Sequence, residues 1–558
     1  MKLLTVKIHN FRSILDVEII VHNFLLLVGA NNAGKSTIIN ALRAFYDDLK
    51  WKADDFPRAN TADNESWVQL KFRLDDEEWK GLADEYKEGI DDQSLTLRRY
   101  FRSDNKSFVQ KDQSNIFGFI KNEISEEMFY SAKNLAAANI GQILYVPALT
   151  TAAEQTKTSG PSPLRNMLNY LLDKVVSKSD AYKEMITAFE NLNKEARGEN
   201  GFLNEIARPL NKAISNWNIK IDISVNSVQP QDISKSLVKF DFIDSNIGNE
   251  NFELESFGHG FQRSVIYELL SLAPTFKNEK KTKKKGFNPT FNLILFEEPE
   301  AFLHPTQQEN LAYHLRRLAD EDGQQVIITT HSQTIAGKAA EKMKQLVRVQ
   351  RTQDGTKIFQ PNENTINEIL NQEKKIQAVV NKNQSNFETH KQKETELRFQ
   401  LWLDGERSSL FFADKVLLVE GSTERGLFNY LLATKWNNLR EHHICVVDVL
   451  GKYNFPRYME LLKAYGISHG IIFDDDMEKN QHRMINKTIE NSINRYTLAE
   501  PEKLKGCLET FLGLSIPKDN YKKDLEILKA LTEGKISDEK LQALQIKLCN
   551  ALAINIMS

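Results

Sequence analysis

Two short acidic segments have the composition of a divalent-metal site. VLLVEGSTE ends an apolar stretch at Glu420 and reaches Glu424 one helical turn later, on the same side. GIIFDDD ends another apolar stretch in Asp474 and Asp476, which face one side of an extended chain. Hard carboxylate oxygens favour Mg²⁺ or Mn²⁺, and two such ions stabilise both the attacking and the leaving oxygen of a phosphodiester. Either segment alone is also typical of solvated acids at a loop tip, so the metal site is predicted from the pair.

A glycine-rich segment has the spacing of a phosphate-binding loop. It reads GANNAGKST and matches GxxxxGK[ST], between an apolar stretch and a helix predicted at 36–50. Backbone N–H groups of such a loop bind phosphates, Lys35 bridges the terminal phosphates, and the Ser36 hydroxyl binds Mg²⁺. The sequence therefore predicts an ATP site, with the binding residues Gly29, Asn31, Asn32, Gly34, Lys35, Ser36 and Thr37.

Two further apolar stretches end in groups suited to ATP hydrolysis. NLILFEEPE ends in Glu297, predicted to hold the magnesium through water, and Glu298, predicted to polarise the attacking water. QVIITTHSQ ends at His331, whose imidazole we expect to sense the γ-phosphate. Solvated acids and a structural histidine are the alternatives. A weaker pattern, SFGHGFQR, precedes an apolar helix and either binds an anion or caps that helix. Its candidate ATP-binding residues are Ser256, Gly258, Gly260 and Gln262.

The order of these motifs resembles that of ABC-type ATPases, and the opening KIHNFRSI resembles the first strand of their DNA-maintenance branch. The resemblance implies that the signature segment of one subunit completes the ATP site of another. A homodimer or a higher even oligomer, with ATP between the heads, is therefore expected. Two departures are Glu297-Glu298 in place of Asp-Glu, and SFGHGFQ in place of LSGGQ. Gln69 and Gln142 both stay candidates for the glutamine that attends the magnesium.

The acidic segments resemble those of the TOPRIM domain, and Gly451-Lys452 resembles the glycine segment of its nuclease-type members. An ABC-type ATPase with EEPExxLHP, followed by a C-terminal TOPRIM domain, resembles the OLD (overcoming lysogenization defect) family of nucleases along the whole chain. The resemblance implies one further Glu and one Lys in the metal site. Glu509 is the candidate for the Glu, and the candidates for the Lys are Lys522, Lys523 and Lys529.

The predicted fold class is α/β, with an ABC-type P-loop ATPase head followed by a Rossmann-like TOPRIM domain. The predicted boundaries are 1–154 and 218–365 for the two parts of the ATPase, 155–217 for a helical dimerisation insert, 366–411 for a polar helical linker, and 412–558 for the TOPRIM domain. The net charge of −3 excludes a histone-like basic binder. Three cysteines without a CxxC motif fit a reducing compartment, and no membrane span or secretion signal is visible, so we expect a cytoplasmic protein.

These patterns together predict an ATP-binding, Mg²⁺- or Mn²⁺-dependent DNA endonuclease or nickase whose ATP state controls the TOPRIM site. Hydrolysis at a two-metal site needs no external energy, so we expect ATP to inhibit cutting. The resemblance implies defence against phage beside a separately encoded partner, such as a helicase or a reverse transcriptase with its RNA. The alternative is an ABC-type DNA clamp or sensor ATPase with a regulatory or inert TOPRIM domain. The run at 277–285, in which six of nine residues are lysine, is either a sequence-blind DNA contact or a solvated loop.

Overall fold

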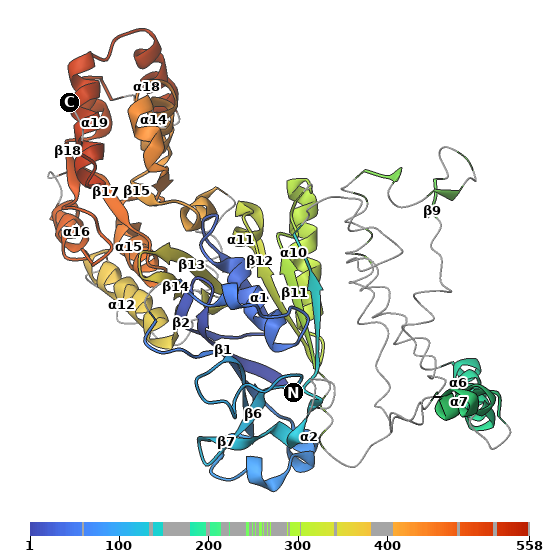
Figure 1. The fold of residues 1–558 in the computed structure, drawn as a ribbon. Helices are drawn as coiled ribbons and strands as arrows, with labels where there is room; N and C mark the ends of the chain where they lie inside the picture. The colour runs from blue at the N-terminus through green and yellow to red at the C-terminus, as the bar shows by residue number, and fades with distance from the viewer. Residues whose placement is uncertain are drawn as a thin grey trace. The chain divides into compact units, whose positions relative to one another are not determined.

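The computed structural model folds as two units (Figure 1). The first combines Met1–Ile143, Gly286–Glu300 and His304–Ser558, and the second combines Leu144–Lys285 and Ala301–Leu303. The structure describes residues 1–58, 61–132, 138–148, 179–196, 201–213, 291–301, 303–339, 343–380, 406–476, 480–516 and 522–555, with short pieces between 223 and 289. Among the described helices, none is long and apolar enough to span a membrane.

The first sheet of the larger unit carries the phosphate-binding loop. Its six strands follow the order β14-β13-β3-β12-β11-β8, and the four from β13 to β11 are parallel. Strands β3, β11 and β12 are buried along their whole length, as continuous apolar stretches predict. The bounds are β3 (Phe24–Val28), β8 (Gln142–Val146), β11 (Asn292–Glu297), β12 (Gln324–Thr329), β13 (Leu346–Thr352) and β14 (Gly355–Phe359).

Helices cover this sheet and join it to the rest of the head. Helix α10 (Pro305–Ala319) packs on β12, and α11 (Gln333–Ala339) packs on β3 and on α10. Helix α1 (Lys35–Phe45) follows the glycine-rich loop and buries its apolar face, including Ile38, Ile39 and Leu42. Helix α1 also contacts a second, antiparallel sheet of the head.

In the second sheet, strand β4 alternates buried and partly exposed side chains, which is typical of an antiparallel sheet with one covered face. Its order is β2-β1-β4-β5-β6-β7. The bounds are β1 (Lys2–Phe11), β2 (Ile14–Ile20), β4 (Ser66–Arg73), β5 (Ser94–Arg102), β6 (Ile116–Ile120) and β7 (Glu123–Met128).

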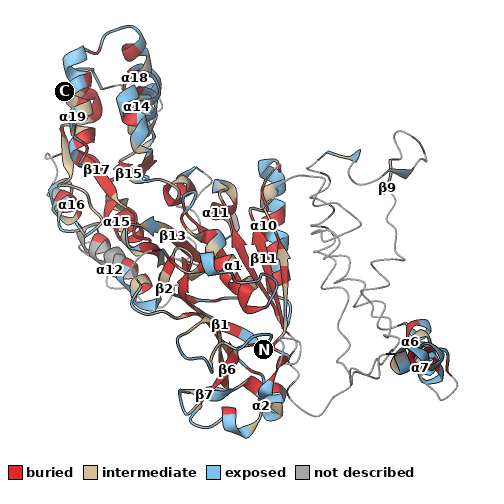
Figure 2. Cartoon of the chain, in the orientation of Figure 1, coloured by how far each residue is buried: buried red, intermediate tan, exposed pale blue. Residues whose placement is uncertain are grey.

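The C-terminal part builds a separate four-stranded parallel sheet, in the order β16-β15-β17-β18. The bounds of its strands are β15 (Lys415–Val419), β16 (Ile444–Asp448), β17 (His469–Asp475) and β18 (Glu502–Lys505). The helices around it are α14 (Ser422–Thr434), α15 (Phe455–Ala464), α16 (Asn480–Glu490), α17 (Leu508–Leu512), α18 (Lys523–Thr532) and α19 (Asp538–Ala551). An apolar core joins the sheet to α14, α18 and α19, and the strand interiors are coloured as buried in Figure 2.

The predicted insert and linker are described only in part. Within 155–217, the structure describes α6 (Asp180–Ala196) and α7 (Phe202–Ala213), which pack on each other. The linker at 366–411 begins within α12 (Glu363–Val380) and ends in a short 3₁₀ helix, η8 (Arg407–Phe411). The lysine run at 277–285 lies outside the described residues.

Candidate active sites

The glycine-rich loop closes around its own lysine. Lys35 is 5% exposed, and its Nζ donates to the carbonyl oxygens of Gly29 at 2.8 Å and Ala30 at 2.9 Å. Burial lowers the pKa of Lys35 to about 8, although the charges of Glu298 and Glu300 act to raise it. Lys35 thus lies inside the loop that the motif describes, and its contact with a phosphate stays a prediction.

Gly34 caps α1 in a backbone conformation that glycine favours. Its φ is +111°, and a Cβ there would lie 2.5 Å from Oγ1 of Thr356 on β14. The turn therefore needs glycine for both conformation and space. It leaves the N-terminus of α1 open beside Asn31, Asn32 and Ser36, which are exposed.

Glu298 and His331 meet beside the loop. Glu297 ends β11 and is buried, whereas Glu298 has a positive φ of +44° and is about two-fifths exposed. The Nε2 of His331 lies 3.5 Å from Oε1 of Glu298. Burial and the nearby charge of Lys35 lower the pKa of His331, against the effect of Glu298, so the imidazole is neutral at pH 7. The two predicted groups are thus brought together next to Lys35.

Glu300 is a functional candidate that the motif reading passed over. It is 9% exposed, and burial raises its pKa. Its Oε1 accepts hydrogen bonds from the backbone N–H groups of His331 at 2.7 Å and Ser332 at 3.1 Å. The third carboxyl of EEPE therefore fixes the turn that carries His331. Its position two residues after Glu298 is the sequence feature from which Glu300 could have been predicted.

The signature segment is described only in part. Ser256 and Gly258 are described, in the smaller unit, whereas Gly260 and Gln262 lie outside the described residues. Of the two magnesium-glutamine candidates, Gln69 accepts hydrogen bonds from Arg98 at 3.0 and 2.7 Å, and Gln142 is exposed at the start of β8. The role of this segment and the choice of glutamine both remain predictions.

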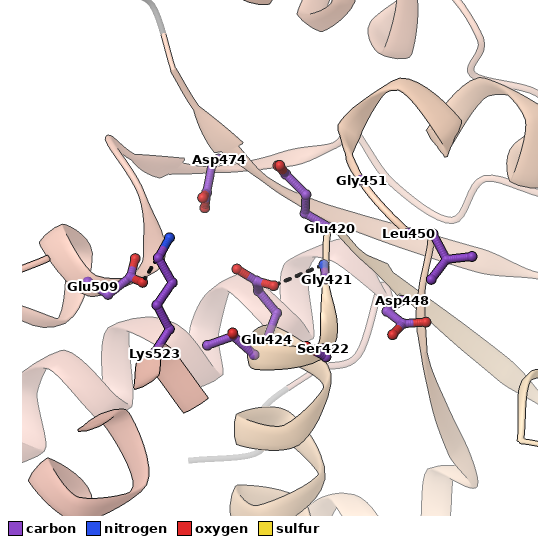
Figure 3. Close-up of a pocket in the computed structure, with 11 residues that line it drawn as sticks. Glu420, Gly421, Ser422, Glu424, Asp448, Leu450, Gly451, Asp474, Glu509 and Lys523 are labelled. Carbon is purple, nitrogen blue, oxygen red and sulfur yellow. Dashed lines mark hydrogen bonds and ion pairs between the residues drawn. The ribbon is translucent and has the colours of Figure 1, made fainter. Parts of the chain in front are cut away.

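The acidic segments of the C-terminal sheet meet in an open cleft of about 340 Å³ (Figure 3). Glu420 follows β15, and Glu424 lies in the first turn of α14, where its Oε2 accepts from the Gly421 N–H at 3.0 Å. Asp474 is the last residue but one of the neighbouring strand β17, and Glu509 comes from α17. Glu424, Asp474 and Glu509 point toward one opening, so parallel strand ends and two helices bring together residues that are 85 positions apart in sequence, as Glu424 and Glu509 are.

The carboxylates of this cleft repel one another. Burial, with the charges of Glu424 and Glu420, raises the pKa of Asp474 to about 8. Burial raises the pKa of Glu420 to about 7, although Lys452 opposes this, and burial also raises the pKa of Glu424. Acids with such raised pKa values are typical of sites that exchange protons for cations.

Two buried carboxylate oxygens without a hydrogen-bond partner indicate whether a metal ion fits this cleft. Oε2 of Glu420 and Oδ1 of Asp474 are buried and have no hydrogen-bond partner. Within the part of the chain that the structure describes, no three His, Cys, Asp or Glu side chains are arranged closely enough to hold one ion. Mg²⁺ commonly uses one or two carboxylates and takes its other ligands from water and substrate phosphate. The cleft therefore fits ions that are completed by a bound substrate.

Asp476 does not line the cleft, although its charge also acts to raise the pKa of Glu420 and of Asp474. Its Oδ2 is 3.2 Å from Nδ1 of His482 and 3.6 Å from Nζ of Lys452. That lysine is buried and also donates to the backbone carbonyl of Asp474. The two acids of DxD thus have different partners, and Lys452 connects them.

Two further charged residues, Lys523 and Asp448, line the cleft. Lys523 is the candidate lysine that lines it, with Nζ 3.4 Å from Oε1 of Glu509. Burial acts to lower the pKa of Lys523, but Glu509 outweighs it and the pKa is raised. Asp448 at the end of β16 was missed from the sequence, although its strand ends at the same edge as β15 and β17. It is 3% exposed and forms an ion pair with Arg407 at 2.6 Å.

Comparison with known proteins yields two family matches. Residues 1–336 match the model "AAA ATPase domain", and residues 411–476 match "Overcoming lysogenization defect protein-like, TOPRIM domain". The chain is 27% identical over 516 residues to the Old nuclease of Escherichia phage P2, covering 86% of this chain and 78% of that protein. It is 24% identical over 528 residues to endonuclease GajA of Bacillus cereus, covering 85% and 73%. A solved SMC head bound to the C-terminal winged helix of ScpA is 15% identical, with a TM-score of 0.38, covering 66% of this chain and all of that one.

Proposed function

Since the chain belongs to the AAA ATPase domain family over residues 1–336 and joins that domain to an overcoming lysogenization defect-like TOPRIM domain, we propose that it is an ATP-binding, divalent-metal-dependent DNA endonuclease or nickase. The observation that carries the proposal is the cleft in which Glu420, Glu424, Asp474 and Glu509 gather with Lys523. Five acids line this opening; Asp448 is paired with Arg407 and Glu509 with Lys523, and bound cations would neutralise the other three, two of which have orphaned oxygens. The named nuclease relatives support the same conclusion.

The residues of the cleft have different roles in the proposed phosphodiester hydrolysis. Glu420, Glu424, Asp474 and Glu509 would hold the ions, which when bound stabilise the attacking and leaving oxygens. Lys523 brings a positive charge to the rim, where it can meet the charge that develops on the phosphate. Lys452 holds the tip of β17 through the Asp474 carbonyl and so keeps that carboxylate in the cleft.

The ATPase residues act on nucleotide. Lys35 and the open N-terminus of α1 bind the phosphates, Ser36 and Glu297 serve the accompanying magnesium, and Glu298 polarises the attacking water. A neutral His331 can accept or donate a hydrogen bond at the γ-phosphate. The nucleotide state is proposed to control cutting, with ATP as the inhibitory state.

The proposed assembly is a homodimer that acts on DNA. Three exposed apolar side chains, Phe202, Ile206 and Leu210, follow one another at four-residue spacing on α7, which supports a helix face covered by a second copy. A role in defence against phage, with a separately encoded partner, is part of the proposal and rests on the family resemblance.

A plasmid-cleavage assay tests this function. Supercoiled DNA is incubated with the protein and Mg²⁺ or Mn²⁺, with and without ATP. We expect nicked or linear product from the wild type, none from the Asp474→Ala/Asp476→Ala variant, and loss of the ATP effect in Lys35→Ala. Identical behaviour of the wild type and the double variant would overturn the nuclease proposal in favour of an ATPase clamp with an inert TOPRIM domain.

A further inference from the structure

A short segment between the two sites touches the histidine of the ATP site. The ring of Phe412, which follows η8, lies with its centroid 6.3 Å from that of His331 and tilted by 32°. Helix α11 begins two residues after His331 and packs against η8. A shift of His331 toward or away from a γ-phosphate would therefore press on residues 406–412.

The same segment forms an ion pair with a residue that lines the nuclease cleft. Arg407 in η8 is 8% exposed, and its Nε and Nη2 lie 2.7 and 2.6 Å from Oδ1 of Asp448. Asp448 lines the cleft at the end of β16. A buried charge pair of this geometry is costly to separate, so η8 and the tip of β16 move together.

A second ion pair connects the same segment and Asp448 to α14. Arg425 follows Glu424 on that helix, and its Nη1 lies 3.8 Å from Oδ2 of Asp448. Arg425 also pairs with Glu406, the residue before η8. The segment 406–412 is thus tied to both structures that carry cleft residues, a strand end and the first turn of α14.

We propose that η8 with Phe412 carries the nucleotide state from His331 to Asp448 and Glu424, through the ion pairs of Arg407 and Arg425. The inference rests on the proposed function and names the route of its regulation. Packed elements and buried ion pairs shift between discrete arrangements, which allows a small change at His331 to alter the spacing of the cleft acids.

A second connection joins the ATPase sheet to the TOPRIM domain and serves as the rival route. Arg348 on β13 donates to the carbonyl oxygens of Tyr465 at 3.1 Å and Gly466 at 2.9 Å. These carbonyls lie at the end of α15, and neither residue lines the cleft. This contact can hold the domain in place, whereas η8 reaches the cleft itself.

The first test measures cleavage as a function of nucleotide. In Phe412→Ala we expect cleavage without ATP within about twofold of wild type and the ATP effect reduced about tenfold, because the ring contact is lost while the ion pairs remain. Phe412→Tyr, which keeps the ring, should restore the effect. Lys463→Met, which removes the 3.1 Å ion pair with Glu368 between α12 and α15, is the matched control and should respond as wild type.

The possible failures can be told apart. If the wild type does not cut DNA, the proposed function fails. If it cuts equally with and without ATP, nucleotide control fails and this inference fails with it. If it responds to ATP and Phe412→Ala responds equally, only the route through η8 is wrong.

A thiol readout tests the route without any cleavage. Oγ of Ser409 in η8 lies 3.0 Å from Sγ of Cys445 on β16, so movement of η8 would change the exposure of that thiol. In a Cys507→Ser background, with Cys549 buried, a non-hydrolysable ATP analogue with Mg²⁺ should change the labelling rate of Cys445 by about threefold or more. The change should vanish in Lys35→Ala and in Phe412→Ala. A full change in Phe412→Ala would overturn the inference.

Discussion

Nζ of Lys523 lies 3.4 Å from Oε1 of Glu509, although the two residues belong to different helices, α18 and α17. Both line the cleft that holds Glu424 and Asp474. Thr423 of α14 contacts Asp524 of α18, so the helix that carries Lys523 is tied directly to the helix that carries Glu424. The ammonium is therefore held at the rim by a carboxylate on one side and a helix contact on the other.

Replacing Lys523 tests this placement. We expect Lys523→Ala to lower the cleavage rate about 10²-fold or more, because a charge aimed at a transition state in a partly enclosed site is lost. Lys529→Ala on the same helix removes an exposed lysine and should cleave as wild type. Rates are measured on supercoiled plasmid at saturating metal, and equal losses in both variants would contradict the assignment.

Glu298 supplies a prediction about ATP hydrolysis alone. Glu298→Gln keeps the shape and removes the base, so hydrolysis should fall about 10²-fold while ATP binding is retained. Phosphate release and nucleotide affinity, measured on the same preparation, separate the two effects. Glu321→Gln, at an exposed position before β12, is the control. Loss of binding in Glu298→Gln would show that the carboxylate supports the fold of the loop instead.

Metal addition should stabilise the TOPRIM domain. A ligand present at 100 times its dissociation constant stabilises by about 2.7 kcal/mol, so millimolar Mg²⁺ or Mn²⁺ should raise the melting temperature by several degrees. Asp474→Asn should lower this shift, because a neutral amide oxygen binds a divalent ion more weakly than a carboxylate does.

Asp475→Asn is the neighbouring control for that experiment. Asp475 accepts a hydrogen bond from Nδ2 of Asn486 and does not line the cleft, so its replacement should leave the metal shift intact. A metal shift of the same size in wild type and Asp474→Asn would remove Asp474 from the metal site.

The local motifs could be read from the sequence because each depends on residues within one turn or strand. The loop at Gly34 and Lys35 lies between β3 and α1, and Glu420 and Asp474 stand at the ends of buried strands, as predicted. What the motif reading missed depends on distant partners. Asp448 is held by Arg407, which lies 41 residues away in sequence. Lys523 could be distinguished from the other two candidate lysines only by its contact with Glu509 of α17, which depends on how α17 and α18 pack.

The two-residue period of a strand does not describe both acids of the DxD segment, Asp474 and Asp476. Alternation predicted Asp474 and Asp476 on one side, but Asp476 follows the last residue of β17, where pairing ends. It is then placed by His482 of α16 and by Lys452, neither of which the pattern contains. Side-chain direction past a strand end is set by tertiary contacts, which a two-residue period does not describe.

The apolar stripe on α7 predicts an effect on assembly. Ile206 and Leu210 are 53% and 43% exposed, and their burial in a dimer would stabilise it by a few kcal/mol. Ile206→Asp/Leu210→Asp should therefore halve the mass measured by light scattering at micromolar protein. Glu205→Arg, at an exposed polar position on the same helix, should leave the mass unchanged. A dimer that persists in the double variant would place the interface elsewhere.

His469 makes the stability of the TOPRIM domain depend on pH. The ring is fully buried at the start of β17, with Nδ1 2.9 Å from the Ile467 carbonyl and Nε2 3.1 Å from Thr497 Oγ1. Burial lowers its pKa from 6.5 to about 4, so the unfolded chain binds a proton between these values that the folded chain does not. Stability must then fall as the pH drops from about 6.5 to 4, and by linkage the loss from this residue is on the order of 3 kcal/mol.

Comparing variants isolates this contribution from the acids of the cleft, whose raised pKa values act with the opposite sign. His469→Gln keeps a hydrogen-bonding side chain but does not titrate, so its urea midpoint should fall less between pH 7 and pH 4.5 than that of wild type. His443→Gln is the control, because that ring is exposed and pairs with Asp414 at the surface. The quantity compared is the change in midpoint for the TOPRIM transition. Equal changes in wild type and His469→Gln would mean that the folded protein accepts the proton on His469, and that the pocket at the start of β17 opens to water above pH 4.5.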